Sequence, residues 1–274
     1  MAVTMADIQK LRKMSGAGMM DCKNALEEAD NDFEKAMEII RKKGQAVAAK
    51  RSDRDASEGC VLATENGGFA AIVAVKCETD FVAKGADFIA MTQNILDVAI
   101  ANKPDNKEDL LNATCSDGRT VAERITDRIG ITGEKMELGY YEFVNDASTI
   151  SYIHPGNKLA TIVAFNKALE RQVARDIAMQ VAAMNPVSVT PADVPQKVIH
   201  TEMEIARDKA RQAGKPENML DRIAEGALQK FYKESTLLQQ EFIKDSKLTV
   251  EQYLKQQDKE LTVTAFKRVT LNVD

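Results

Sequence analysis

The sequence is poor in the residues that most often carry catalysis and metal binding. It has two histidines and four cysteines in 274 residues, and no two cysteines are spaced as Cys-x-x-Cys. A zinc site needs clustered thiolate or imidazole ligands, so this spacing argues against one. With so few histidines, a Ser-His-Asp or Cys-His arrangement has few possible members. The cysteines are expected to be free, partly buried thiols in a reducing compartment.

Signatures of phosphate, nucleic-acid and membrane binding are also missing. No Gly-x-x-x-x-Gly-Lys-Ser/Thr loop occurs, and Gly16-x-Gly18 lacks a third glycine and a preceding strand. The net charge of −5 offers no basic excess for direct nucleic-acid binding. The N-terminus does not read as a signal peptide, and no apolar run is long enough to span a bilayer, so a cytoplasmic protein is expected. These absences favour an interaction protein, without cofactor, metal or catalytic residues, over an enzyme.

Residues 1–54 are expected to form a three-helix N-terminal domain and a linker. Apolar residues recur at helical spacing in three short segments, which are separated by residues that cap or break helices. Bundles of this size usually serve as docking modules and rarely as catalytic ones. The expected boundaries are Thr4 with Asp7 at the first helix start, a break at 15–18, a second helix over 19–29, Asn31 as the cap of the third helix and Gly44 at its end.

The middle of the chain is expected to form two related α+β modules with antiparallel sheets. Asn66-Gly67 between two apolar runs predicts a β-hairpin, and residues 69–75 are apolar enough for a strand buried on both faces. The order of strands, hairpin and helix recurs further along. The first module is placed at 55–139 and the first part of the second at 140–190, with helices at 83–102, 121–129 and 169–183 and a later strand group at 135–144, 149–154 and 158–165.

Residues 191–231 are expected to form an antiparallel coiled-coil hairpin that protrudes from the core. Ile199, Met203, Ala206, Ala210 and Ala213 are spaced as a heptad seam of mainly small residues. A turn at Gly214-Lys215-Pro216 leads to an answering seam. Residues 232–274 are expected to return to the second module, with a short helix at 250–254 and a closing strand at 261–273. The fold class is therefore α+β.

The segment between the buried strand and the helix after it stands out for its chemistry. Thr79 can cap a helix, and Asp80 would lie favourably at the positive end of that helix. Phe81 follows, and two interpretations are open for it. The usual burial of phenylalanine favours a core position, whereas an exposed side chain would be an apolar anchor for a partner.

At this point the residues resemble a known family. The run from Thr79 to Lys84, Thr-Asp-Phe-Val-Ala-Lys, resembles the signature loop of elongation factor Ts. The run from Leu11 to Leu26 is similar to the opening of the same family, with Ser15 in place of the more usual threonine. Further similar positions are Ala29, Asp32, Ala36, Arg41, Gly44, Tyr152, His154, 177–183, 214–216 and 230–234.

The resemblance implies a guanine nucleotide exchange factor that binds elongation factor Tu, displaces its Mg²⁺ and promotes GDP release. It also implies a ubiquitin-associated type of N-terminal domain, the two-module core and the protruding coiled coil. With it, the anchor becomes the favoured interpretation of Phe81. The partner-binding residues that it suggests are Thr79, Asp80, Phe81 and Val82 in the loop, Met19, Met20 and Lys23 in the N-terminal domain, and His154 in the core.

Two other functions remain open from the residues alone. The chain could be a general adaptor whose three-helix domain binds another protein, or an enzyme that uses Cys77 as its nucleophile. Glu78 and Asp80 beside that thiol disfavour the thiolate, which ranks the enzyme last. Adjacent helical residues cannot share one face, so at least one of Met19 and Met20 is expected in the bundle core. The oligomeric state stays open.

Overall fold

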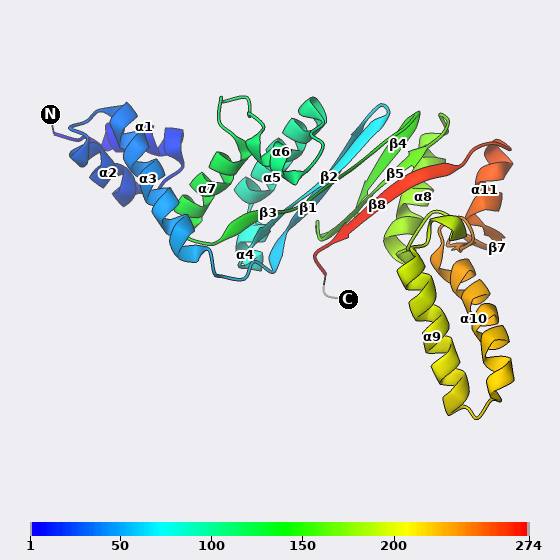
Figure 1. Ribbon diagram of the computed structural model, residues 1–274. Helices are drawn as coiled ribbons and strands as arrows, with labels where there is room; N and C mark the ends of the chain where they lie inside the picture. The colour runs from blue at the N-terminus through cyan, green and yellow to red at the C-terminus, as the bar shows by residue number, and fades with distance from the viewer. Residues whose placement is uncertain (1, 273–274) are drawn as a thin grey trace. The chain divides into compact units, whose positions relative to one another are not determined.

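The computed structural model describes residues 2–272, which combine helices with small sheets in an α+β fold (Figure 1). The chain divides into two compact units. The first contains residues 2–62, 73–142 and 271–272, and the second contains residues 63–72 and 143–270. None of the helices in the described residues has the length and apolar character that crossing a membrane requires.

Three helices form the N-terminal bundle: α1 (Met5–Ser15), α2 (Met19–Glu28) and α3 (Phe33–Arg51). The capping box expected at Thr4 is confirmed. The amide of Asp7 donates to Thr4 Oγ1 at 3.2 Å, and the amide of Thr4 donates to the Asp7 carboxylate at 3.0 Å. The bundle is closed by a core of small and medium apolar side chains: Ile8, Leu11, Ala17, Cys22, Ala25, Leu26, Ala29 and Ala36.

The cap of α3 differs from the expectation by one residue. Asp32, not Asn31, is the N-cap, and its carboxylate accepts hydrogen bonds from the amides of Glu34 and Lys35 at 3.0 and 3.1 Å. Asn31 instead has a φ of 67° in the turn before the helix. A carboxylate at this position also interacts with the positive end of the helix, so aspartate is a good cap here.

Gly44 does not end α3, which continues for almost two more turns. Gly44 is buried in the middle of the helix, where α3 packs on α7 (Val121–Thr132). A Cβ atom built on Gly130 of α7 would lie 2.6 Å from the Cα of Gly44. The glycine therefore permits a close helix crossing, and its usual role as a helix terminator does not apply.

The first sheet has the strand order β1–β2–β3, with a buried central strand. The hairpin between β1 and β2 is confirmed, and Gly67 takes a φ of 63° in its turn. The strand predicted at 135–144 pairs with β2, so the prediction that it belongs with the later strands was wrong. The helix predicted over 83–102 begins at Ala86, because Gly85 is its N-cap and separates it from the short helix that ends at Ala83. The elements are β1 (Glu58–Asn66), β2 (Phe69–Cys77), α4 (Asp80–Ala83), α5 (Ala86–Asn102), α6 (Lys107–Asn112), α7 and β3 (Met136–Asn145).

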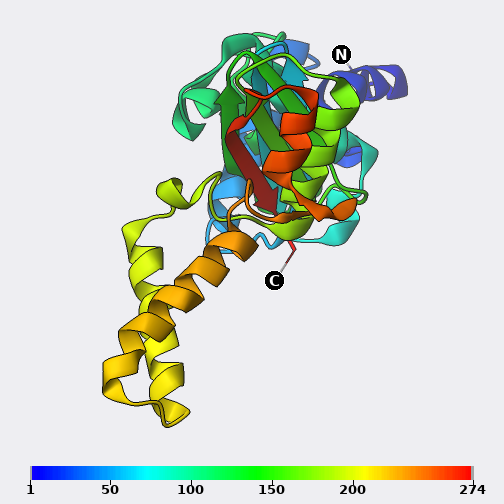
Figure 2. The same cartoon turned by 90° about the vertical axis from the view of Figure 1, so that its right-hand side faces the viewer.

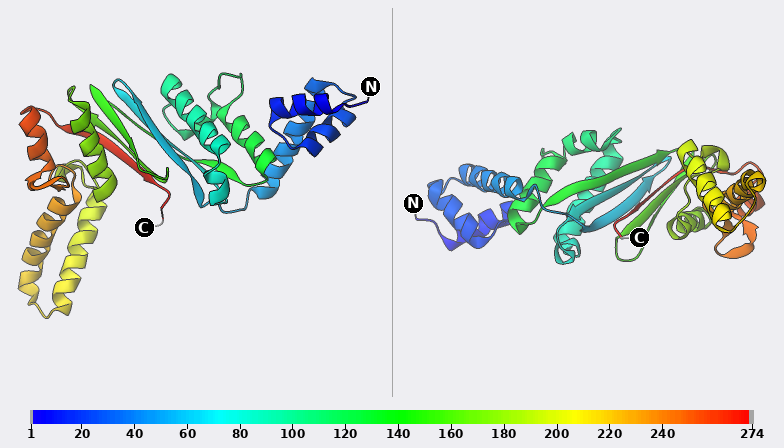
Figure 3. Two further views of the ribbon diagram at one scale, coloured as in Figure 1. Left: turned by 180° about the vertical axis from the view of Figure 1, so that it is seen from behind. Right: turned by 60° about the horizontal axis from the view of Figure 1, so that its bottom comes forward.

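The second sheet is built to the same plan. Strand β5 pairs antiparallel with β4 on one side and with β8 on the other, so each sheet is a hairpin whose second strand also pairs with a strand that returns later. Helix α8 packs on this sheet and lies in front of its strands in the left view of Figure 3. The elements are β4 (Ser148–Ile153), β5 (Leu159–Phe165), α8 (Arg171–Met184), β6 (Glu241–Phe242), β7 (Asp245–Thr249), α11 (Val250–Gln257) and β8 (Val263–Thr270).

An antiparallel helical hairpin of α9 (Gln196–Gln212) and α10 (Leu220–Ser235) extends away from the second sheet (Figure 2). Ala210 and Ala224 are buried in its seam, as the heptad spacing predicts. Its base is closed by backbone hydrogen bonds from the amides of Leu237 and Leu238 to the carbonyls of residues 188 and 189, at 2.9 and 3.1 Å. The small β6–β7 ribbon beside the base was not predicted.

Candidate functional site

The loop singled out by the sequence forms a single helical turn between β2 and α5. Thr79 is its N-cap and accepts a hydrogen bond from the amide of Val82 at 3.4 Å, as expected. Gly85 then caps α5 and separates the two helices. Residues 80–83 therefore form α4, which stands at the end of the buried central strand.

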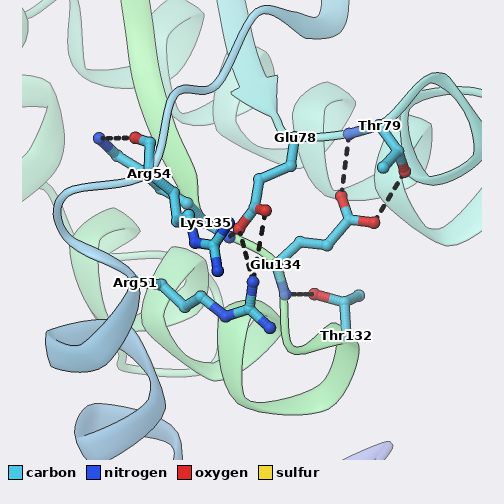
Figure 4. A network of polar contacts seen from close by, with 7 residues as sticks. All are labelled: Arg51, Arg54, Glu78, Thr79, Thr132, Glu134 and Lys135. Atoms are coloured by element: carbon cyan, nitrogen blue, oxygen red, sulfur yellow. Dashed lines mark hydrogen bonds and ion pairs between the residues drawn. The ribbon is translucent and has the colours of Figure 1, made fainter.

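A carboxylate from the end of α7 holds the start of this turn (Figure 4). Glu134 accepts two hydrogen bonds from Thr79, one from the amide at 3.1 Å and one from the hydroxyl at 2.7 Å. The amide of Glu134 donates to Thr132 Oγ1 at 3.3 Å. Two charge-assisted bonds to one residue fix both its backbone and its side chain. Glu134 was not predicted from the sequence, because it lies 55 residues from Thr79 in the chain.

A second carboxylate supports the same turn from the other side. Glu78 Oε1 accepts a hydrogen bond from the amide of Lys135 at 2.6 Å, and Arg51 Nη1 lies 3.4 Å from both Glu78 oxygens. Only 18% of the Glu78 side chain is exposed. The residue before Thr79 is therefore anchored to both α3 and the start of β3, which leaves the loop little freedom at its base.

Phe81 points into solvent from this rigid base. Its side chain is 85% exposed, which corrects the burial that the residues alone favoured. Ala83 occupies the inward side of the turn and is 5% exposed, so the larger side chain is left outside. A fully exposed phenylalanine on a firmly held turn fits the alternative interpretation, an apolar anchor.

Charged groups surround the anchor. Lys84 Nζ lies 2.6 Å from an Asp80 oxygen, and this hydrogen bond and the charge of Asp80 raise the pKa of Lys84. Arg128 and Thr132 of α7 line a shallow hollow beside Phe81. Arg128 donates to Asp87 at 3.2 Å through Nη2, whereas its buried Nε finds no hydrogen-bond partner within residues 2–272. Nothing in the sequence had singled out Arg128.

The methionines of the N-terminal bundle are both exposed, which corrects the expectation that one belongs to the core. Met19 is 41% exposed and Met20 is 65% exposed. Smaller residues of α2 fill the core instead, among them Cys22 and Leu26. Lys23 follows on the same helix and lies 3.7 Å from Glu27. The first turn of α2 thus presents flexible apolar side chains, a feature of adaptable protein-binding surfaces.

His154 lies just after β4 in the second unit, whereas the other suggested residues lie in the first. It is exposed, and its Nδ1 is 3.0 Å from Tyr152 Oη. The guanidinium carbon of Arg175 lies over the ring of Tyr152, 5.8 Å from the ring centroid. The histidine is thus held by an aromatic neighbour on an open surface.

Cys77 is poorly placed to act as a nucleophile. It is fully buried, and its thiol donates to the carbonyl of Thr79 at 3.3 Å. A nucleophilic cysteine must reach its substrate as an accessible thiolate. None of the four cysteines forms a disulfide within the described residues, and all four are buried, where partly buried thiols were expected.

The fold and the site together define an α+β protein that combines a three-helix bundle, two hairpin-based sheets and a helical hairpin with a rigid, apolar loop. Comparison with known proteins identifies the group to which such a chain belongs. The sequence profile of the family described as Elongation factor TS matches residues 78–272. The chain belongs to the elongation factor Ts family.

Full-length relatives agree with this assignment. The chain is 73% identical to the elongation factor Ts of Porphyromonas gingivalis over 274 residues, and 58% identical to that of Azobacteroides pseudotrichonymphae over 275 residues. It is 49% identical to the elongation factor Ts of Phocaeicola vulgatus over 331 aligned positions. Each comparison covers the whole of both chains, so the similarity includes the N-terminal bundle that the family profile leaves out.

Proposed function

We propose that the chain is a guanine nucleotide exchange factor that binds elongation factor Tu, displaces Mg²⁺ and promotes the release of GDP during translation elongation in the cytoplasm. It does so without catalytic residues of its own. The observation that carries the proposal is the exposure of Phe81, 85%, on a turn held by Glu134 in a member of this family. The likeness of the chain to elongation factors Ts over their full length supports it.

Phe81 acts in this proposal as a wedge that enters an apolar pocket of the GTPase near its Mg²⁺ ligands. The turn is fixed at its start, so little conformational freedom is lost when the side chain inserts, and more of the binding free energy remains for displacing the ion. Asp80 assists by exchanging its partner Lys84 for polar groups of the GTPase. Thr79 and Val82 hold and flank the wedge.

Exchange requires only that the factor and GDP bind the GTPase with opposite preferences. If the exchange factor weakens the binding of GDP to the GTPase by a given ratio, GDP weakens the binding of the exchange factor by the same ratio. A thousandfold weakening corresponds to about 4 kcal/mol of coupling, which a well-filled pocket and several polar contacts supply. The first turn of α2 adds a second contact through Met19, Met20 and Lys23, and His154 adds a third from the second unit.

We propose a separate role for each part of the chain. Residues 1–54 dock on the GTPase, residues 55–139 carry the wedge, and residues 140–190 with 232–274 form the second core module. The helical hairpin within 191–231 is an extension of that module.

Stopped-flow release of fluorescent GDP from elongation factor Tu tests the proposal directly. Adding the unmodified chain is expected to accelerate release by several orders of magnitude. Phe81→Ala is expected to lose about 30-fold or more of that acceleration, the effect of removing a central apolar anchor worth about 2 kcal/mol.

The control is thermal unfolding of the variant, which is expected to match the unmodified chain because Phe81 makes little contact with the core. Thr270→Ser, on the edge of the second unit, serves as a neutral variant for the exchange assay. Unaltered GDP release with Phe81→Ala would refute the wedge, and no acceleration by the unmodified chain would refute the exchange activity itself.

A further inference from the structure

Helix α3 belongs to two parts of the first unit at once. Its first half closes the bundle core through Ala36, and its second half packs on α7. The two glycines at the crossing, Gly44 and Gly130, bring the helix backbones into close contact. No proline and no change of helix type interrupts residues 33–51. The bundle is therefore joined to the module that carries Phe81 by one continuous helix and not by a flexible linker.

The end of α3 is tied to the base of the Phe81 turn, as Figure 4 shows. Arg51 lies in the last turn of the helix and approaches both oxygens of Glu78 at 3.4 Å. Lys135 Nζ donates to the carbonyls of Ser52 and Arg54, at 2.9 and 2.8 Å, just beyond the helix end. The amide of the same Lys135 donates to Glu78. A cation at a helix C-terminus satisfies carbonyls that the helix leaves free.

Two routes thus connect α3 with Thr79, the cap of the turn. One runs through Arg51 and Lys135 to Glu78, the neighbour of Thr79 in the chain. The other runs through α7, whose end supplies Glu134 to Thr79. Both routes end within three residues of Phe81, and both begin on the helix that closes the bundle.

We propose that α3 is a rigid connector that fixes the Met19 and Met20 surface relative to Phe81, with Arg51 and Lys135 as positioning residues. The role of the connector in exchange rests on the proposed function, whereas its rigidity does not. Two contacts on one rigid body engage a partner together, so the second contact forms at high effective concentration. Loosening the joint lowers that concentration without removing either contact.

The joint variant combines Arg51→Met with Lys135→Met. It keeps the aliphatic stems, the Glu134–Thr79 bonds and the amide of Lys135, and it removes only the cationic ends. The matched control combines Lys42→Met with Lys50→Met, which takes the same charge from exposed positions of α3. Thermal unfolding of both variants checks that the fold is retained.

The first measurement needs no partner. Spin labels are placed at Met20→Cys and Val82→Cys, because the four native cysteines are buried, and their distance distribution is measured. A single narrow distance is expected in the otherwise unmodified chain and in the Lys42→Met, Lys50→Met control. The joint variant is expected to give a broader distribution. A broad distribution in the otherwise unmodified chain, or no broadening in the joint variant, would overturn the proposal that α3 is a rigid connector.

The second measurement is the Kd for nucleotide-free elongation factor Tu. The joint variant is expected to bind about tenfold more weakly than the control, because part of the effective concentration is lost. In a Met19→Ala, Met20→Ala background the same joint variant is expected to change the Kd less than about twofold, since the bundle no longer contributes. An equal loss in both backgrounds means that Arg51 and Lys135 merely support the loop, and overturns the positioning role. If neither the unmodified chain nor any variant binds elongation factor Tu, the proposed function is refuted. The spin-label distances then remain the test of whether α3 is rigid.

Discussion

Each three-stranded sheet has a central strand that leads into a helix, and the two connections can be compared. After β2, residues 78–85 form a turn that is tied down at its base and presents Phe81 to solvent. After β5, residues 166–170 lead directly into α8, and the apolar residue there, Leu169, packs against the core. The same architecture thus places the apolar side chain of the connection in solvent in one module (Phe81) and against the core in the other (Leu169).

The polar anchoring of the second connection is correspondingly different. Asn166 exchanges hydrogen bonds with the segment before β8, donating to the carbonyl of Glu260 at 2.8 Å and accepting from the amide of Thr262 at 2.9 Å. Lys167 pairs with Glu260 and Asp258 at 2.6 and 3.2 Å. These contacts join the connection to its own sheet. The exposure of Phe81 is therefore a property of its local sequence and not a requirement of a strand-to-helix connection.

The largest expected effect contrasts the two phenylalanines nearest these connections. Phe165 ends β5 and is fully buried, so Phe165→Ala is expected to lower the free energy of unfolding by about 3–5 kcal/mol. Phe81→Ala is expected to change it by less than about 0.5 kcal/mol. Urea unfolding at constant m-value measures both. A cost above about 1 kcal/mol for Phe81→Ala would mean that the side chain packs on the fold, and the contrast between the modules would disappear.

A smaller effect is expected from the glycines of the two units. Gly130→Ala places a methyl group 2.6 Å from the backbone of Gly44 and is expected to cost about 1–3 kcal/mol, because the helices must separate. Gly226 lies in α10 with open space around it, so Gly226→Ala is expected to stabilise the chain by about 0.5–1 kcal/mol. Thermal unfolding distinguishes the two, and a stabilising Gly130→Ala would contradict the close crossing.

Exchanging the apolar residues of the connections for aspartate sharpens the comparison. Leu169→Asp is expected to cost about 1–2 kcal/mol, because a partly buried side chain loses its contacts and a charge must be desolvated. Phe81→Asp is expected to leave the unfolding midpoint unchanged and to abolish stimulated GDP release. Equal destabilisation by the two substitutions, measured by urea unfolding, would show that both side chains face inward.

The smallest expected effect is on acid stability and concerns the second connection alone. The amide of Glu260, followed by Lys167, lowers the pKa of Asp258 below its ordinary value of 3.8. The folded state therefore binds this proton less readily than the unfolded state. The resulting stabilisation is present above pH 3.8 and is lost as the pH falls through the lowered pKa. NMR titration of the Asp258 carboxyl group checks this, with Lys167→Met expected to move its midpoint upward.

Much of the fold could be predicted from the sequence where local pattern and tertiary structure agree. The Asn66-Gly67 hairpin and the Thr4–Asp7 capping box followed from turn and cap chemistry, and both are present. The end of α3 could not be predicted in this way. Gly44 carries a helix-ending signal locally, but its role is decided by Gly130, which lies 86 residues later in the chain.

The exposure of site residues was harder to predict than their identity. Burial preference alone placed Phe81 inside. The argument that adjacent helical residues cannot share one face placed one of the two methionines in the core. The structure fills those inward positions with Ala83 and Cys22 instead. The supporting residues Glu134 and Arg128 lie about 50 residues from the loop, so no local pattern could have connected them with it.

The closed base of the helical hairpin has a consequence for how this chain can vary. The two segments that lead into and out of the hairpin are joined by backbone hydrogen bonds between residues 188–189 and 237–238, so the ends of the hairpin are held in fixed positions. The hairpin beyond them can be shortened or lengthened by whole helical turns, and the entropy cost of closing a longer excursion grows only slowly with its length. It is therefore a natural place for grafting another module onto the protein without disturbing the residues that carry Phe81.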